Sequence, residues 1–372
     1  MLRARKDVEK QESKILADYA VKSAGSKGRQ YAEKEAPDRT CFQRDRDRIM
    51  YSKAFLRLRG KTQVVLASHG DHFRTRMDHT QYVASVSRSI TQSLGLNQDL
   101  AEAIALAHDL GHTCFGHEGE YTLDEMMKKY GSHFEHNEQS LWIVEKLEIK
   151  SKNYNGLNLT FEVRDGIDKH RTAYDNPQSR DNLMPSLEAQ VVNIADEIAY
   201  NFHDLDDGFR AEVFSKKDLE NLQIWQLSKK TLEEGDSDLN MNIRSKIMEM
   251  MISDLIKTTS GNLEINNIHS VEDVYKHPKE LVYFSDSMRT MIDGLKSFLF
   301  NRFYKSDDVR RYNKQGRQVI TFLFEKFYNE PELMPDEFKD MLNKEEKHIV
   351  IKDYVAGMTD GYAIEIYNKF YK

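Results

Sequence analysis

The distribution of proline constrains the fold of this chain more than any other feature. The sequence contains 6 prolines, and none lies within residues 38–176 or 186–277. Proline inside a helix removes a backbone donor and clashes with the preceding turn, so long proline-free stretches favour helices. Apolar residues recur there every three or four positions. Two such stripes are Val83, Val86, Ile90 and Leu94, and Leu187, Val191, Ile194 and Ile198. The pattern predicts an all-α protein, with LNLTFEV at 157–163 as the one candidate for a short strand.

Composition excludes several classes of protein. The chain has 372 residues, of which 39% are hydrophobic and 31% charged, so we expect a large folded core. No run of 18 apolar residues is present, which argues against a membrane span. The N-terminus MLRARKDVEKQE lacks the apolar segment of a secretory signal. Two cysteines, Cys41 and Cys114, are too few for a disulfide framework, and we expect a cytoplasmic protein.

The histidines indicate where the chemistry lies. Eight of the 13 histidines fall within residues 69–136, and residues 108–120 read HDLGHTCFGHEGE. An adjacent histidine and aspartate offer one cation an imidazole and a carboxylate. The two glycines at 111 and 116 allow the chain to turn, so that His112 and His117 can face one cavity. Three histidines and an aspartate within ten residues therefore predict a metal-dependent site.

Further polar residues suit the same site. His79 stands upstream in RMDHT, and Asp196 stands downstream within an apolar helical stripe. A carboxylate in such a place is unfavourable unless it is paired or binds a metal. Asp196, Tyr200 and Asp204 are spaced four residues apart, which places them on one helix face. That row is expected to run from a metal to a substrate.

The order His…His-Asp…Asp resembles that of the HD-domain metal-dependent phosphohydrolases. Within them, the chain looks like the bacterial deoxyguanosine-triphosphate triphosphohydrolases. The similar segments are RTCFQRDRDRIMYSKAFLRLRGKTQV (39–64), HDLGHTCFGHEGE, FEHNEQ (134–139), LEAQVVNIADEIAY (187–200) and DYVAGMTDGYA (353–363). Many members have proline where this chain has Cys114, a departure that leaves the ligand positions intact.

The resemblance implies an all-α fold and a reaction. We expect one helical domain over residues 1–372, with a metal-site core at about 39–210 and a C-terminal helical part at about 211–372. The expected enzyme is a hydrolase that cuts a dNTP, either dGTP or several dNTPs, between the α-phosphorus and the 5′ oxygen. The expected products are a deoxynucleoside and intact tripolyphosphate.

The resemblance also assigns roles to residues. The matches to the metal ligands are His79, His108, Asp109 and Asp196. Two imidazoles and two carboxylates accept Mn²⁺, Fe²⁺, Zn²⁺ or Mg²⁺, and the identity of the ion stays open. The matches to the catalytic group are His112, His117, Glu120 and His136. The matches to substrate-binding residues are Gln63, Arg76, Tyr200 and Asp204.

Each matched residue has an expected task. His117 corresponds to the catalytic histidine near the scissile bond, and Glu120 to the carboxylate that orients it. Arg76 corresponds to a phosphate-binding arginine. Tyr200 is expected to pack against C2′ and leave no room for a ribose 2′-hydroxyl, while Asp204 accepts the 3′-hydroxyl. His170, in the basic run DKHR, is as consistent with a phosphate contact as with a structural role.

Partners and alternatives complete the expectations. Family members form oligomers, so we expect a homo-oligomer, with a hexamer favoured, and a dNTP activator stays open. The Lys/Arg-rich stretch 302–317 leaves single-stranded nucleic acid open as a partner. One alternative function is another HD-domain hydrolase, such as a nucleotidase or phosphodiesterase. The other is a nucleotide or single-strand binding protein without catalysis.

Overall fold

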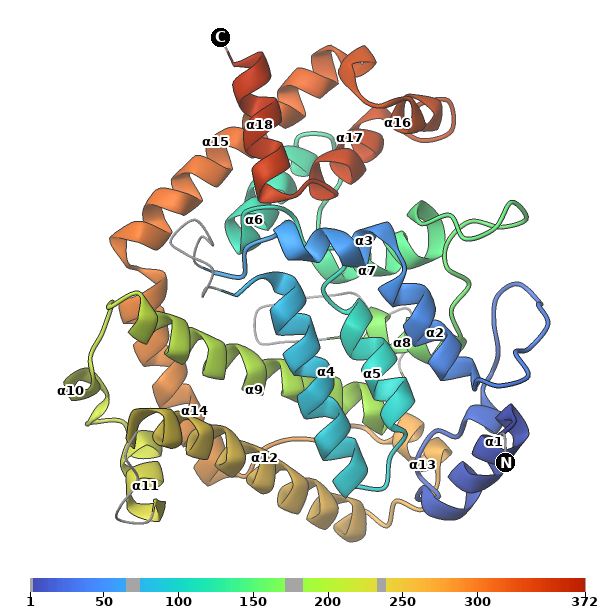
Figure 1. The fold of residues 1–372 in the computed structure, drawn as a ribbon, viewed down its shortest axis with the longest axis vertical. Coiled ribbons are helices and arrows are strands. Elements are labelled where there is room, and N and C mark those ends of the chain that lie inside the picture. Colours follow the sequence, from blue (N-terminus) through green and yellow to red (C-terminus); the bar gives the residue numbers. More distant parts are fainter. Residues whose placement is uncertain (1–2, 65–73, 171–182, 233–238, 372) are drawn as a thin grey trace. The chain divides into compact units, whose positions relative to one another are not determined.

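The computed structural model describes residues 3–64, 74–170, 183–232 and 239–371 (Figure 1). Within these ranges the chain forms helices, connecting loops and three isolated β-bridges, and no β-strand. The all-α expectation is therefore confirmed. None of the helices in these ranges is long and apolar enough to cross a membrane.

The predicted short strand at 157–163 is wrong. Helix α8 (Phe161–Asp168) occupies its second half, and Thr160 makes only an isolated bridge to Arg29. Val163 and Ile167 are both fully buried. Their spacing of four residues places them on one helix face, and this burial outweighs the β propensity of the segment.

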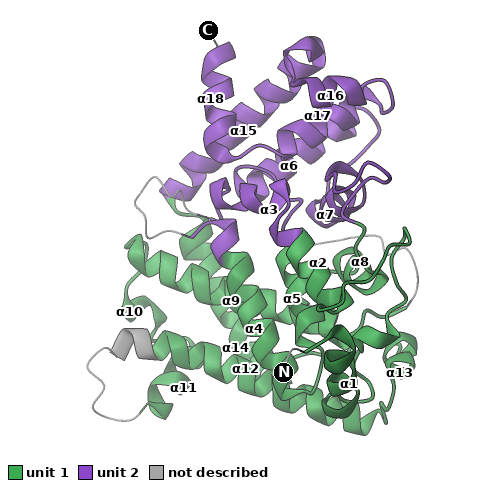
Figure 2. Ribbon diagram, turned by 45° about the vertical axis from the view of Figure 1, so that its right-hand side comes forward, with its two compact units in different colours: residues 1–48, 79–106, 158–306 green, residues 49–78, 107–157, 307–372 purple. Residues whose placement is uncertain are grey.

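The chain divides into two compact units, which Figure 2 shows in green and purple. Unit 1 comprises residues 1–48, 79–106 and 158–306, and unit 2 comprises residues 49–78, 107–157 and 307–372. The chain passes between the units several times. That residues 1–372 act as one domain stays a prediction.

Unit 1 is built around the 24-residue helix α9 (Leu187–Arg210). Ser186 caps its N-terminus by accepting a hydrogen bond from the Ala189 amide, and Pro185 precedes the cap. Helices α8, α12 and α14 pack against it. The helices wholly or mainly in this unit are α1 (Arg5–Ile15), α2 (Cys41–Met50), α4 (Arg76–Ser93), α5 (Gln98–Ala107), α8, α9, α10 (Lys216–Leu219), α11 (Gln223–Thr231), α12 (Leu239–Ile265), α13 (Val271–Lys276) and α14 (Asp286–Leu299), with the short turns η1 (Ser23–Gly25) and η5 (Phe300–Tyr304).

The two apolar stripes read from the sequence lie on helices of unit 1. Val83 and Ile90 on α4 and Val191 and Ile198 on α9 are fully buried, whereas Ile194 is half-buried. Burying each such side chain contributes about 1.5–3 kcal/mol to folding. These stripes therefore hold α4 and α9 in place, and both helices carry expected site residues.

Unit 2 is organised by α15 (Asp307–Asn329), which packs against α6 (Gly116–Lys128), α17 (Lys347–Ala356) and α18 (Asp360–Phe370). Its buried core includes Leu123 and Met127 of α6 together with Ile320 and Phe324 of α15. The remaining elements are α3 (Lys53–Arg57), η2 (Leu58–Gly60), α7 (His136–Trp142), η4 (Ile143–Leu147), η6 (Pro331–Leu333) and α16 (Asp336–Met341). This core fixes the start of α6, where HDLGHTCFGHEGE ends.

A buried carboxyl joins three segments of unit 1. Glu188, at the start of α9, accepts hydrogen bonds through Oε1 from the Val21 amide (3.0 Å) and the Asn97 amide (3.1 Å). Its Oε2 is buried and has no hydrogen-bond partner among the described residues. Burial raises the pKa of Glu188 to about 7, because the surroundings disfavour the charge.

Glu188 should therefore make stability depend on pH. Its pKa rises on folding from 4.5 to about 7, so the folded state favours the proton. This stabilisation is complete below pH 4.5 and is lost as pH rises to 7, and it amounts to about 3 kcal/mol. Glu188→Gln keeps the acceptor and cannot ionise. The free energy of unfolding of this variant minus that of wild type, measured with urea, should rise by about 2 kcal/mol from pH 5 to pH 8. Exposed Glu264→Gln is the control, and an equal pH response in all three proteins would contradict the assignment.

Two glycines offer a matched test of packing. A Cβ on Gly111 would lie 2.1 Å from the His136 carbonyl oxygen and 2.3 Å from the Ser140 amide nitrogen, both in the α7 backbone. A Cβ on Gly261, inside α12, would meet no atom within 4 Å apart from its chain neighbours and the adjacent backbone of its own helix. Gly111→Ala should lower the free energy of unfolding by at least about 2 kcal/mol. Gly261→Ala should raise it by about 0.5–1 kcal/mol through helix propensity. Thermal unfolding measures both, and a stable Gly111→Ala protein would refute the close approach.

Candidate active site

In unit 1 the expected ligands His79 and Asp196 are in contact. His79 Nε2 lies 2.8 Å from Asp196 Oδ1, and both residues are buried. His79 Nδ1 lies 3.4 Å from His203 Nδ1, with the rings edge to face. His79 thus contacts a carboxylate through one ring nitrogen and a second imidazole through the other. His203 therefore orients the imidazole of His79.

The row on α9 continues from Asp196 to Tyr200 and Asp204, as the spacing predicted. The Tyr304 hydroxyl donates a hydrogen bond to Asp204 Oδ2. The ammonium of Lys296 lies 5.7 Å from the centre of the Tyr200 ring. His170 Nε2 is 3.6 Å from Asp196 Oδ2, so this histidine faces the row. Unit 1 thus presents a buried histidine–aspartate pair beside a tyrosine and a second carboxylate.

In unit 2 a buried carboxylate, Asp109, is surrounded by three basic groups. Its Oδ2 lies 3.0 Å from Arg76 Nη1. Its Oδ1 lies 3.4 Å from His108 Nε2 and 3.2 Å from His112 Nε2. Burial opposes ionisation of Asp109, but His108, Arg76 and His112 together hold its pKa well below the usual range. Asp109 is therefore ionised at neutral pH.

Glu120, a second carboxylate of unit 2, lies close to three histidines. Its Oε1 accepts from the backbone amide and from Nδ1 of His136, each at 2.9 Å. Its Oε2 lies 3.6 Å from His117 Nδ1 and 3.8 Å from His112 Nδ1. Burial opposes its ionisation, yet His136 and His117 hold the pKa of Glu120 well below normal. The shortest contact of Glu120 is thus with His136 rather than His117.

The three imidazoles form a compact group. The rings of His112 and His136 stack with centroids 3.8 Å apart, and those of His112 and His117 meet edge to face at 5.5 Å. Burial, Arg76 and His136 hold the pKa of His112 well below its usual value, so this ring is neutral at pH 7. The side chain of His117 is 45% exposed. Of the three, His117 is the one exposed to solvent.

Backbone geometry places these side chains. Phe115 (φ 64°) and Gly116 (φ 59°) are both left-handed, which turns the chain abruptly into α6. Asp360 holds this turn by accepting from the Phe115 amide (3.0 Å) and from the Tyr312 hydroxyl (2.8 Å). Gly111 donates to Ser140 Oγ (2.8 Å), which in turn donates to the His108 carbonyl (2.7 Å).

Arg76 and Gln63 are among the buried polar groups of unit 2 that have unused hydrogen-bonding capacity. Arg76 is 1% exposed, and its Nε and Nη2 have no hydrogen-bond partner among the described residues. Gln63 Oε1 is also buried and has no hydrogen-bond partner among the described residues. Unsatisfied buried donors and acceptors are rare in folded proteins, so each calls for an explanation. An anionic ligand on Arg76 would supply the missing acceptors.

The structure places the expected residues in two groups. Those in unit 1 are His79, Asp196, Tyr200 and Asp204, and those in unit 2 are Gln63, Arg76, His108, Asp109, His112, His117, Glu120 and His136. Sequence reasoning missed three residues that contact members of these groups: His203 contacts His79, Tyr304 donates to Asp204, and Lys61 donates to the His112 carbonyl oxygen. His203 could have been found, because it follows Asp196 by seven residues and so shares its helix face. Tyr304 and Lys61 carry no such signal.

Cys114 is not part of either group. Its side chain is fully buried, and burial raises the pKa of the thiol far above the usual range. A thiol that stays protonated is a poor zinc ligand. The departure from the family pattern at this position therefore changes packing rather than ligation.

The Arg76–Asp109 pair should be strongly coupled in metal-free protein. Asp109→Ala leaves a buried guanidinium without its carboxylate and should lower the free energy of unfolding by about 3–5 kcal/mol. The free energy of unfolding should fall less in the double variant Arg76→Met/Asp109→Leu than in the single variants Arg76→Met and Asp109→Leu added together. The difference should be at least about 2 kcal/mol. The exposed pair Glu272–Lys276 (3.3 Å) is the control, with coupling below about 1 kcal/mol. Equal coupling for both pairs in urea unfolding would contradict this picture.

Comparisons with known proteins identify the family of this chain. Residues 76–201 match the HD domain, and residues 282–369 match the phosphohydrolase-associated domain. A deoxyguanosinetriphosphate triphosphohydrolase-like protein of Ralstonia pickettii is 43% identical over 370 residues, covering 96% of this chain and 94% of its own length. Proteins of the same description from Leptospira interrogans (42%, 98% of each chain) and Geobacter sulfurreducens (38%, 96% and 95%) are similar to it. The resemblance seen in the motifs is confirmed: the chain belongs to the deoxyguanosinetriphosphate triphosphohydrolase-like family of HD-domain phosphohydrolases.

Proposed function

We propose that this protein is a metal-dependent dNTP triphosphohydrolase that releases a deoxynucleoside and tripolyphosphate. The observation that carries the proposal is the buried Arg76. Its guanidinium is fixed by Asp109 (3.0 Å) and has two further donors unused among the described residues. Such a fork matches the oxygens of a phosphate. It stands in a group of histidines suited to proton transfer, in a family whose relatives are described as deoxyguanosinetriphosphate triphosphohydrolase-like.

The donor set fits a divalent metal. We propose His79, His108, Asp109 and Asp196 as its ligands. Two ligand atoms each about 2.1 Å from one ion lie roughly 3–3.4 Å apart. The contacts His79–Asp196 (2.8 Å) and His108–Asp109 (3.4 Å), each within its own unit, are close to that separation. When bound, such an ion would polarise a phosphate oxygen and acidify a bound water.

The protein's own groups define the rest of the mechanism. Arg76 binds a phosphate oxygen and holds the triphosphate in place. His117, half-exposed and beside Glu120, is placed to transfer a proton at the 5′ oxygen of the leaving deoxynucleoside. Glu120 stays ionised and fixes the tautomer of His136, while neutral His112 supports the stack. We propose that Tyr200 excludes a ribose 2′-hydroxyl and that Asp204, held by Tyr304, accepts the 3′-hydroxyl.

Two other functions remain as alternatives. A nucleotidase or phosphodiesterase would use the same kind of metal site but release other products. A binding protein without catalysis would leave the histidine group without a task, although that group includes a half-exposed imidazole next to an ionised carboxylate. A homo-oligomer such as a hexamer, a dNTP activator, single-stranded nucleic acid as a partner and the cytoplasmic location stay predictions, as do the preferred base and the metal.

A product assay tests the proposal. The protein with Mn²⁺ or Mg²⁺ is given each dNTP, all four together, and the matching ribonucleotides, and the products are separated by anion exchange. We expect deoxynucleoside and tripolyphosphate from dNTPs and little from ribonucleotides. His117→Gln should lower kcat about 100-fold or more. His133→Gln, an exposed histidine paired with Glu138, is the matched control and should retain activity. Activity only in the mixture would indicate an activator.

Other outcomes would decide against the proposal. Release of pyrophosphate or monophosphate would identify a different HD-domain hydrolase. Tight dNTP binding without turnover under any metal would favour a sensor. Equal losses in His117→Gln and His133→Gln would show that the histidine group is not catalytic.

A further inference from the structure

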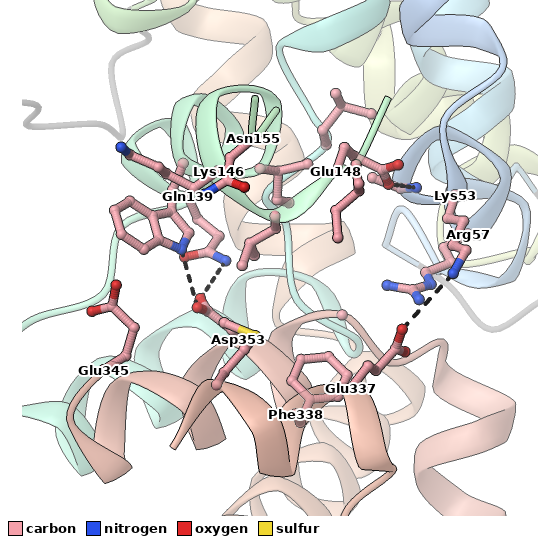
Figure 3. A pocket seen from close by; sticks show the side chains of 18 of the residues that line it. Lys53, Arg57, Gln139, Lys146, Glu148, Asn155, Glu337, Phe338, Glu345 and Asp353 are labelled. Carbon is pink, nitrogen blue, oxygen red and sulfur yellow. Dashed lines mark hydrogen bonds and ion pairs between the residues drawn. The ribbon is translucent and has the colours of Figure 1, made fainter. Parts of the chain in front are cut away.

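Unit 2 contains a cavity that none of the proposed site residues lines. Its volume is about 330 Å³, and it lies among α3, α7, η4, α16 and α17 (Figure 3). Pockets that hold small molecules start at about 300 Å³, so the space suffices for a small ligand. All of its lining residues belong to unit 2.

The walls of this cavity are largely apolar. The apolar lining side chains are Ala54, Leu110, Trp142, Ile143, Leu147, Ile149, Phe338 and Met341. The indole of Trp142 is fixed, because its Nε1 donates to Asp353 Oδ2 at 3.0 Å. Two aromatic rings, Trp142 and Phe338, therefore offer faces for a planar or aliphatic body.

The charged groups around the cavity favour an anion. Three of its four acids are engaged: Glu148 accepts from the Ala54 amide (2.8 Å), Glu337 lies 3.9 Å from Lys53 Nζ, and Asp353 accepts from Gln139 (2.9 Å) as well as Trp142. The fourth acid, Glu345, is exposed.

Apart from Lys61, which donates to two backbone carbonyl oxygens, three cations of the lining have no such partner. They are Arg57, Lys146 and Lys344, and none forms an ion pair with a carboxylate of the described residues. Arg57 is half-buried, and Figure 3 shows its guanidinium pointing toward the middle of the pocket. A guanidinium in that position suits a carboxylate, sulfonate or phosphate group.

We propose that this cavity binds a small amphiphilic organic anion, with its apolar body against Trp142 and Phe338 and its anionic group on Arg57. Two structural links connect the occupant to the histidine group. Helix α7 carries His136 at its first position and places Gln139 and Trp142 in the cavity wall.

The second link is Lys61. This residue lines the cavity, is 2% exposed and donates to the carbonyl oxygens of His112 and Ala356, the latter at 3.0 Å. A ligand that orders α7 and Lys61 would also order His136 and His112. The cavity is thus a second site whose occupancy adjusts the histidine group.

The probe for this site is 8-anilinonaphthalene-1-sulfonate, an aromatic anion whose fluorescence rises in apolar surroundings. We expect saturable binding to the full-length protein. Arg57→Gln should weaken it about fivefold or more, as expected for loss of a charged hydrogen bond that is partly exposed to water. Arg59→Gln, an exposed arginine two residues away that does not line the cavity, should bind as wild type does. Trp142→Phe should reduce energy transfer to the probe, with Trp225→Phe as its control.

Equal affinities of the Arg57 and Arg59 variants, or no saturable binding, would overturn the site. Circular dichroism and melting temperature exclude a folding defect as the cause. The link to the histidine group is measured by hydrogen–deuterium exchange. Saturating probe should slow exchange in α7 and in residues 108–112, and unchanged exchange there would refute the link. Both readouts are independent of turnover, so they stand or fall separately from the proposed reaction.

Discussion

The ion pair between Arg76 and Asp109 is the interaction on which the candidate site depends. A single charge buried to this degree would be strongly unfavourable, and the pair is tolerated because each charge neutralises the other. Asp109 also contacts His108 and His112, so one carboxylate holds three basic side chains in place. The arrangement leaves Arg76 with two buried donors that no described residue satisfies. An anionic ligand would accept hydrogen bonds from these two donors and so stabilise the folded protein further.

Glu120 plays the same part for the second half of unit 2. Because its pKa is held well below normal, it stays ionised and fixes the orientation of His136 and His117. His112, in contrast, is kept neutral by burial and by neighbouring cations. Two ionised carboxylates and one neutral imidazole thus lie within a few ångströms of one another. Acid–base chemistry requires neighbouring groups that are held in different protonation states in this way. In unit 1 a carboxylate likewise holds a histidine, because Asp196 contacts His79, and His203 contacts the other ring nitrogen of His79.

Much of the candidate site could be read from the sequence because its members are close along the chain or regularly spaced. Asp196, Tyr200 and Asp204 share a helix face as their four-residue spacing requires, and residues 108–120 supply most of the histidine group. Sequence reasoning failed where contacts are distant. Tyr304 reaches Asp204 across 100 residues, and Lys61 reaches the His112 carbonyl across 51. The expected contact of Glu120 with His117 is present at 3.6 Å, but the shorter contact of Glu120, with His136 sixteen residues further on, was not foreseen.

The sequence by itself determined the helical fold, the family and the set of polar residues, because proline placement, apolar periodicity and motif order are local properties of the chain. Only the tertiary structure decided which carboxylate holds which histidine, that Arg76 is buried with donors to spare, and that a cavity lies behind α7. Those features depend on burial and on distances between side chains from separate helices. Protonation follows from them, since it is the surroundings of a group rather than its place in the sequence that set its pKa.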